Sequence, residues 1–228
     1  MRALRSPWLL ATWVLLAGVL LWDACGLDLQ VMQLWGSTQG FALKDQPWLS
    51  ELLHRRGQQV ADGFFLLLWI MVWRPWGPWR ALERRERLAA AVAVTASVLT
   101  VAVMKHFSLT SCPWDLRLFG GPADHVSHWA WGVADHGGGK CFPGGHASSA
   151  FGFLALSLPF LRSGQTALRR QGWRLLAAAV LVGLVFGATQ TVRGAHYPSH
   201  TLWAAWICWT VGLAVYQLAA WRRPALQG

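Results

Sequence analysis

Six apolar stretches, separated by polar connectors, form the main pattern of this chain. Each is long enough, or nearly so, to cross the hydrocarbon core of a bilayer, which takes about 20 helical residues. They cover residues 7–22, 60–76, 88–104, 146–161, 172–192 and 199–221. The pattern predicts an all-α fold: a six-span transmembrane helical bundle that forms a single integral membrane domain over residues 1–228.

The first apolar stretch also has features of a cleaved signal. It follows Arg2 and Arg5, and Cys25 lies where a lipoprotein signal could end. Trp22 and Asp23 fit a cleavage site poorly, so we expect this stretch to remain as an anchor.

The composition favours a membrane location. Hydrophobic residues make up 54% of the 228 residues and charged residues 13%, about half the usual share in a soluble domain. The 17 tryptophans crowd the ends of the apolar stretches, where the bilayer interface concentrates this residue. The net charge of +10 could suggest nucleic acid, but the arginines cluster in short connectors and no nucleic-acid motif is present. We therefore expect a membrane partner and no nucleic acid.

The basic residues also predict the orientation of the chain. They crowd the N-terminus, the connectors after the second and fourth stretches, and the tail with Arg222 and Arg223. Because positively charged connectors stay in the cytoplasm, both termini are expected there, and the connectors after stretches one, three and five face outward. We expect a protein of a bacterial inner membrane whose outward connectors lie in the periplasm.

The first outward connector, residues 23–59, contains a short helical pattern. Trp48, Leu49, Leu52 and Leu53 have helical spacing, and two arginines follow them. This segment is expected either to lie on the membrane surface or to pack on its own protein as an ordinary loop helix.

Candidate chemistry begins at residues 141–149, CFPGGHASS, where the fourth stretch starts. Gly144 and Gly145 have no Cβ, so the backbone can turn sharply and an anion can approach it closely. The first amides of a helix have no internal partner, and the helix dipole favours negative charge there. A glycine turn alone is a weak signal, but with the residues described next it predicts a phosphate cradle with His146 at its edge.

Further polar residues lie at the outward helix ends. Lys105 closes the third stretch, and Arg193 and His196 lie between the fifth and the sixth. One histidine can attack phosphorus while the other protonates the leaving oxygen, and the cations and amides can hold the phosphoryl oxygens. Each residue could instead snorkel or cap a helix. Their coincidence on one side of the membrane indicates phosphoryl transfer.

The order of these residues resembles the three-part signature of the type 2 phosphatidic acid phosphatase family, whose superfamily also includes vanadium haloperoxidases and bacterial acid phosphatases. The matching segments are Lys105…Pro113, Pro143-Gly144-Gly145-His146 and Arg193…His196-Tyr197-Pro198-Ser199. The resemblance covers a phosphatase-like core at residues 88–221, and the six-span layout agrees with the membrane lipid phosphatase branch. Six spans argue against a haloperoxidase, because those enzymes are typically soluble.

The resemblance implies a role for each matched residue. It makes His196 the nucleophile and His146 the general acid, and it implies that no metal or other cofactor is needed. Arg193 is implied to assist catalysis. The implied phosphate-binding residues are Lys105, Gly144, Gly145 and Arg193.

Four positions depart from the family pattern. Cys112, Gly144, Gln190 and His200 stand where the family has arginine, serine, arginine and aspartate. Arg193 lies about one helical turn from Gln190, so it could deliver its guanidinium to a similar place. Without the aspartate, either Asp115 or His200 is the candidate that orients His196.

The cysteines of the largest outward connector allow two interpretations. Cys112 and Cys141, together with His125 and His128, could suggest a metal site, but metal signatures have tighter spacing, so we expect none. We predict a disulfide between Cys112 and Cys141, because an extracytoplasmic compartment permits the bond. The alternative is two unrelated thiols.

We expect an enzyme that hydrolyses a phosphomonoester or diphosphate of a lipid through a phosphohistidine intermediate. Phosphatidate-type lipids, polyprenyl diphosphates and lipid A phosphates are candidate substrates. The alternatives are a phosphotransferase that moves a phosphoryl group between lipids and a catalytically inactive lipid-binding membrane protein. The substrate is expected to enter sideways from the outer leaflet, past an opening flanked by Trp114, Trp129 and Trp131.

Overall fold

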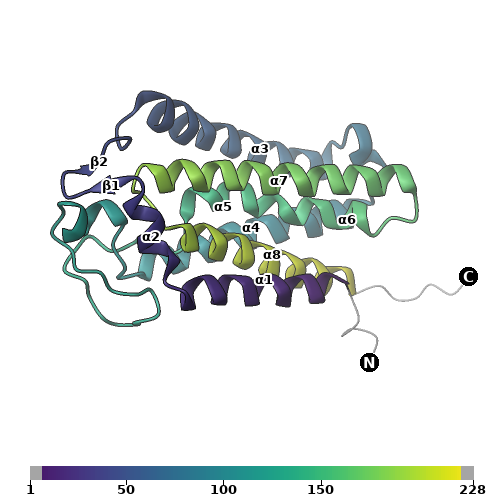
Figure 1. Cartoon of the computed structure of the whole chain (residues 1–228). Helices are drawn as coiled ribbons and strands as arrows, with labels where there is room; N and C mark the ends of the chain where they lie inside the picture. The colour runs from purple at the N-terminus through teal and green to yellow at the C-terminus, as the bar shows by residue number, and fades with distance from the viewer. Residues whose placement is uncertain (1–6, 222–228) are drawn as a thin grey trace, which may run out of the picture.

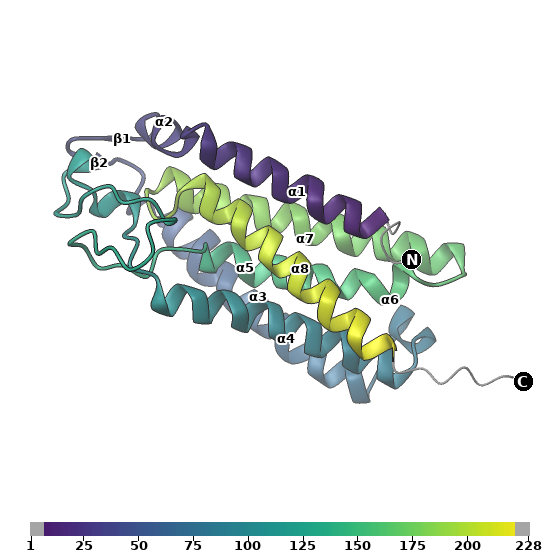
Figure 2. The same ribbon diagram turned by 90° about the horizontal axis from the view of Figure 1, so that it is seen from below.

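The computed structural model describes residues 7–221, with side chains up to residue 219. The long helices lie side by side and run back and forth along one direction (Figures 1 and 2). The shorter elements α2, β1 and β2 and the long connector before α5 gather at one end of this bundle. The first described residues of α1 and the last of α8 lie at the opposite end.

The first part of the chain, up to α3, contains one long helix, short elements and a second long helix. The two-residue strands pair antiparallel, with Gly36 opposite Phe41 and Ser37 opposite Gly40. The π-helical segment η2 continues directly into α3. In order, the elements are α1 (Pro7–Ala24), α2 (Leu27–Gln33), β1 (Gly36–Ser37), β2 (Gly40–Phe41), η2 (Trp48–Arg56) and α3 (Gly57–Trp73).

The rest of the chain contains four long helical segments, and a long connector joins the first two of them. α5, η6 and α6 follow one another without a break. In order, the elements are η3 (Gly77–Ala81), α4 (Arg84–Phe107), η4 (Pro113–Asp115), η5 (Arg117–Phe119), α5 (Gly145–Phe151), η6 (Gly152–Leu156), α6 (Ser157–Leu161), α7 (Thr166–Val192) and α8 (Pro198–Trp221).

All six predicted apolar stretches are helical over most of their length, but they differ in length and in apolar character. Four described helices, α1, α4, α7 and α8, are long and apolar enough to cross a membrane. The helix Gly145–Leu161 is apolar but shorter, and α3 has 17 residues. The four long helices are compatible with an integral membrane protein, whereas the count of six spans stays a prediction.

The interior of the bundle is packed with apolar side chains from several helices. Val94 and Val101 of α4, Phe151 of α5 and Ala204 of α8 are almost completely buried in one cluster. Two glycines of α7 allow close helix contacts: a Cβ on Gly183 would lie 2.3 Å from the Phe151 ring, and one on Gly187 would lie 2.2 Å from the Thr201 side chain. Large apolar side chains remain exposed on the outside of α3, α4, α7 and α8, as a lipid-facing surface requires; examples are Leu66, Leu99, Leu181 and Leu218.

Helix α1 packs against α8. Trp206 donates its indole N–H to the Thr12 carbonyl (3.1 Å), and Trp209 donates to the Thr12 hydroxyl (2.8 Å). The first apolar stretch is therefore part of the bundle in this structure. The arginines at positions 2, 5, 222 and 223, on which the predicted orientation partly rests, lie outside the described residues.

The helical segment expected at residues 48–53 is present as η2, and it packs on its own protein. Leu49 is only 2% exposed, and the segment contacts both α3 and α7. Trp48 and Leu52 remain exposed on its outer side. The segment lies at the same end of the bundle as the polar connectors, beside the candidate site.

Candidate active site

The turn between α7 and α8 carries His196. The backbone amides of Ala195 and His196 both donate to the Gln190 carbonyl, and Gly194 adopts a φ of +78° that only glycine accommodates easily. A Cβ on Gly194 would lie 2.4 Å from the Phe41 ring, so the turn is held tightly against β2. His196 is thereby fixed, and it is only 7% exposed.

The glycine loop before α5 lies between the ends of α4 and α8. The Gly144 amide donates to the His200 carbonyl over 2.9 Å. A Cβ on Gly144 would lie 3.0 Å from that same oxygen, and one on Gly145 would lie 3.1 Å from the Lys105 side chain. The absence of side chains here allows α4, α5 and α8 to meet. Lys105 also donates to the Lys140 carbonyl (2.6 Å), which places the ammonium at the edge of the loop.

His146 is held between two rings at the start of α5. It stacks on Phe186 of α7 and lies against His54 of η2, each with a centroid distance of 4.4 Å. Its Nε2 lies 3.2 Å from the Leu53 carbonyl. A carbonyl only accepts hydrogen bonds, so Nε2 carries the proton and Nδ1 has the lone pair. Nδ1 is buried without a partner among the described residues, so it can take up a proton once a substrate or water reaches it.

Arg193 is joined to His54 through Gln190. Its Nε donates to the Lys44 carbonyl (2.8 Å), and another guanidinium nitrogen donates to Oε1 of Gln190 (3.3 Å). The amide nitrogen of Gln190 then donates to Nδ1 of His54 (3.2 Å). The guanidinium of Arg193 therefore lies beside position 190, one helical turn away.

The ring of His196 is kept neutral by its surroundings. Burial and, after it, the positive charge of Lys105 lower the pKa of His196 to about 3. Nδ1 of this ring lies 3.3 Å from the Cys141 sulfur. A disulfide sulfur has no proton to donate, so this contact favours the tautomer with the proton on Nδ1 and the lone pair on Nε2. A neutral imidazole with a free Nε2 is the form that can attack phosphorus.

Cys112 and Cys141 form a disulfide, with Cα atoms 5.2 Å apart. The pairing predicted from the sequence is thus present. The two sulfurs and a ring nitrogen of His196 lie within 4.8 Å of one another. Because the sulfurs are bonded to each other, they are not thiolate ligands in this state. The bond instead joins the segment after α4 to the glycine loop beside His196.

The comparisons with known proteins identify the family. Residues 87–224 match the model of the PAP2 superfamily, which is more than half of the chain. The chain belongs to the PAP2 superfamily. No curated protein and no solved structure matches it significantly. Membership in PAP2 supports phosphatase-type activity in general.

Within this PAP2 site, the two candidates for orienting His196 are placed differently. The His200 ring lies 5.8 Å from that of His196, and its Nδ1 donates to the Cys141 carbonyl (2.9 Å). Asp115 lies in η4, and among the described residues its carboxylate forms no hydrogen bond with His196. The groups next to Nδ1 of His196 are those of Cys141, a residue that the sequence did not suggest for this role.

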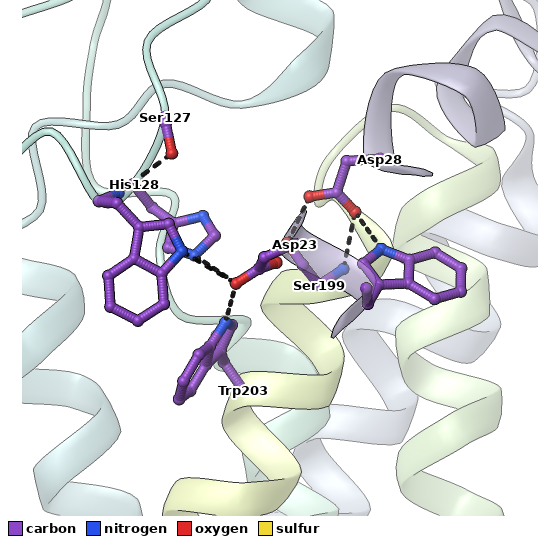
Figure 3. Close-up of polar contacts among 8 residues, drawn as sticks. Asp23, Asp28, Ser127, His128, Ser199 and Trp203 are labelled. Atoms are coloured by element: carbon purple, nitrogen blue, oxygen red, sulfur yellow. Dashed lines mark hydrogen bonds and ion pairs between the residues drawn. The ribbon is translucent and has the colours of Figure 1, made fainter. Parts of the chain in front are cut away.

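Two aspartates from outside the PAP2 match hold the start of α8 (Figure 3). Asp28 accepts hydrogen bonds from the Ser199 amide (2.9 Å), the Ser199 hydroxyl and the indole of Trp22. A carboxylate at this position caps the helix and is favoured by its dipole. It therefore fixes the backbone three residues after His196.

Asp23 stabilises α8 in a similar way one turn further along the helix. One of its oxygens accepts from Trp203 (2.8 Å), Trp129 (3.0 Å) and His128 (3.2 Å). The carboxylate joins the end of α1 to α8 and to the connector before α5 (Figure 3). The sequence offered no local signal for either aspartate. Trp22 is close to Asp28 in the chain, but the other partners of the two aspartates are more than 100 residues away.

Proposed function

We propose that this PAP2 protein hydrolyses a phosphomonoester or diphosphate of a lipid without a metal, through a phosphohistidine intermediate. The observation that carries the proposal is that Lys105, His146 and His196 lie at the glycine loop, at one end of the bundle. Arg193 is linked to His146 through Gln190 and His54. The chemistry of each group fits one part of phosphoryl transfer.

In the first step, Nε2 of His196 attacks the terminal phosphorus, and the bond from that phosphorus to the leaving oxygen breaks. This oxygen belongs to the lipid alcohol of a monoester or to the remaining phosphate of a diphosphate. Burial, followed by electrostatic repulsion from His54, lowers the pKa of His146 to about 4 in the free protein. The negative charge of the bound substrate raises this pKa, so that His146 in its protonated form gives its proton to the leaving oxygen. In the second step, His146 takes a proton from water as the water attacks the phosphohistidine. Inorganic phosphate leaves, and both histidines return to their starting states.

The phosphoryl oxygens are held by groups that stay in place during the reaction. Lys105 and Arg193 supply positive charge, and the amides at the start of α5 supply donors that need no reorganisation. These groups can bind the terminal phosphoryl group of a phosphomonoester or of a diphosphate, so both are candidate substrates.

A groove beside the site supports a lipid substrate. It has a volume of about 350 Å³ and lies between α3, η6 and α7; among its lining residues Ser149 is the one with a polar side chain. Its walls include Val60, Phe64 and Val182. Phe186 lines the groove and also stacks on His146, so the groove begins at the acid–base histidine. An acyl or prenyl chain can lie in it while the phosphate lies at the glycine loop.

The location of the disulfide supports an outward site. The connector between α4 and α5, which contains both cysteines, lies at the end of the bundle opposite to the ends of the described chain. Disulfides persist in oxidising compartments such as the periplasm. We therefore propose an inner-membrane protein with its active site on the periplasmic side.

The proposal is tested with the full chain purified in detergent and a panel of phosphatidate-type lipids, polyprenyl diphosphates and lipid A phosphates. Phosphate release that continues in a metal chelator and is lost in His196→Ala supports it. Equal release by the wild type and His196→Ala contradicts it. Phosphate that appears on a second lipid instead of in solution identifies a phosphotransferase.

The role of the groove has its own matched pair of variants. Ala178→Phe narrows the groove, whereas Ala177→Phe changes a neighbouring residue of α7 that does not line it. Ala178→Phe should raise KM for long-chain lipid phosphates and leave turnover of a short soluble phosphate ester unchanged, and Ala177→Phe should change neither. Equal effects of the two variants would show that the groove does not hold the chain.

A further inference from the structure

In the proposed phosphate cradle, the residues matched to PAP2 use part of their donor capacity within the protein. Lys105 uses one of its N–H groups on the Lys140 carbonyl. Arg193 uses two nitrogens, on the Lys44 carbonyl and on Gln190. The side chains at positions 112 and 144 supply no donor, because one is bonded in a disulfide and the other is glycine. Each of the three equatorial oxygens of a phosphoryl group can accept more than one hydrogen bond, so the group has room for donors beyond Lys105, Arg193 and the amides at the start of α5.

His54 is placed to supply one of them. Gln190 accepts from Arg193 with its oxygen, so its nitrogen must face His54 and donate to Nδ1. In the neutral ring the proton is then on Nε2. Although the residue as a whole is exposed, its ring packs against that of His146; this partial desolvation, followed by the charge of Arg193, lowers the pKa of His54 and favours the neutral form. Within the part of the chain that the structure describes, Nε2 has no hydrogen-bond partner, and the side chain is exposed.

The position of His54 also fits contact with a substrate. Its ring lies 4.4 Å from that of His146. The carbonyl of the preceding residue, Leu53, accepts a hydrogen bond from Nε2–H of His146. The chain of contacts from Arg193 through Gln190 fixes the ring from the other side. An N–H group held in this way can donate to an anion without reorganisation.

We propose that His54 is a third histidine of the active site, whose Nε2–H donates a hydrogen bond to a phosphoryl oxygen of the substrate. The inference rests on the proposed function for the identity of the anion. It extends the site to η2, which lies outside the region matched to PAP2. It also explains the contacts of Gln190, whose amide links the guanidinium of Arg193 to the ring of His54 and so orients that ring.

Two substitutions separate this role from a purely structural one. His54→Asn places an amide near the Nδ1 position, so it can keep the contact with Gln190 but loses the donor at Nε2. His54→Gln places an amide nitrogen near the Nε2 position and so restores that donor. Arg55→Gln is the control, because Arg55 is on the same segment and forms an exposed ion pair with Glu51.

The binding experiment uses inorganic phosphate and the full chain in detergent, with calorimetry as the readout. His54→Asn should weaken phosphate binding about 10- to 100-fold, the effect of one hydrogen bond to a charged group, and His54→Gln should recover most of it. Arg55→Gln should bind as the wild type does. If the wild type binds no phosphate, or if His54→Asn binds as tightly as the wild type, the proposal is wrong. Equal losses in His54→Asn and His54→Gln also contradict it.

A kinetic experiment separates this inference from the proposed function. With the lipid phosphate that is turned over fastest, kcat/KM should follow the same order as phosphate binding. The protein could bind phosphate in a way that depends on His54 and yet release no phosphate from any lipid. This result would contradict the proposed function but still support the role of His54 in anion binding. Full turnover by His54→Asn would contradict the inference and leave the proposed function in place.

Discussion

The parts of the chain before and after residue 87 contribute differently to the site. The later part, which matches PAP2, supplies the groups proposed to react: His146, His196, Lys105 and Arg193. The earlier part supplies groups that hold them in place, together with the proposed donor His54. The Leu53 carbonyl binds His146, the Lys44 carbonyl binds Arg193, and Asp28 binds the start of α8. The reacting groups are thus local to three short motifs, whereas their alignment depends on a segment without such a motif.

This difference gives a physical account of the departures from the family pattern. At position 190 a glutamine stands in place of arginine, and its side chain links Arg193 to His54 of the earlier part. At position 200 a histidine stands in place of aspartate, and its ring donates to the Cys141 carbonyl. Carboxylates of the earlier part bind the first two turns of α8 through Ser199 and Trp203, but not His196 itself.

The largest effect is expected for a reacting group of the later part. His146→Ala should lower kcat about 10²- to 10⁴-fold, the usual span for a lost acid–base group. Steady-state phosphate release on the best lipid substrate measures it. A decrease in kcat of less than about threefold, far below that span, would show that His146 is not the general acid.

The disulfide is expected to have the next largest effect, and it acts on stability. The bond closes a loop of 29 residues, and the chain-entropy model gives about 3–4 kcal/mol for a loop of this size. Cys112→Ser should lower the midpoint of thermal unfolding, and a reducing agent should lower that of the wild type to a similar value. Unchanged unfolding in both cases would show that the bond does not hold the glycine loop.

A smaller effect is expected from the earlier part. Asp28→Ala removes the carboxylate that caps α8, which should cost about 0.5–2 kcal/mol and also lower kcat, because the capped turn follows His196 directly. Asp62→Ala is the control: Asp62 is exposed and accepts from Gln58 on the same helix. Equal unfolding midpoints and equal kcat for the two variants would show that Asp28 of the earlier part does not help to align the site.

The last prediction concerns pH. The pKa of His196 is about 3 in the folded chain, below its ordinary value of 6.5. Between about pH 3 and pH 6.5 the His196 ring is protonated in the unfolded chain but not in the folded one. The contribution of the neutral ring to the free energy of unfolding is therefore complete above pH 6.5 and is lost as the pH falls toward 3. Unfolding midpoints measured from about pH 7 to about pH 4, within this window, should fall more steeply for the wild type than for His196→Gln. Parallel curves would mean that His196 is not buried as a neutral ring.

The sequence alone predicted the local features of the molecule well. Apolar stretches such as 172–192 correspond to helices, and the order of Lys105, His146 and His196 indicated the family that the comparisons show. Helix length and motif spacing are properties of neighbouring residues, so they can be read along the chain.

Contacts between distant segments were not predictable in the same way. His54 lies 92 positions before His146, and no pattern around residue 54 indicates the ring that it meets. The sequence also suggested Asp115 as the group that orients His196, whereas Nδ1 of that ring lies beside Cys141. The packing of α4, α5 and α8 around the glycine loop decides which residue faces the buried ring. The spacing of residues along the chain does not reveal this packing.

The central claim, that His196 forms a covalent bond to phosphorus, has one direct measurement. The wild type is mixed with a lipid phosphate labelled on its phosphoryl group, quenched in alkaline denaturant during turnover, and digested. The account predicts that the label is found on His196 and is absent from His196→Ala. Label on another residue, or turnover without any phosphate bound to the protein, would contradict it.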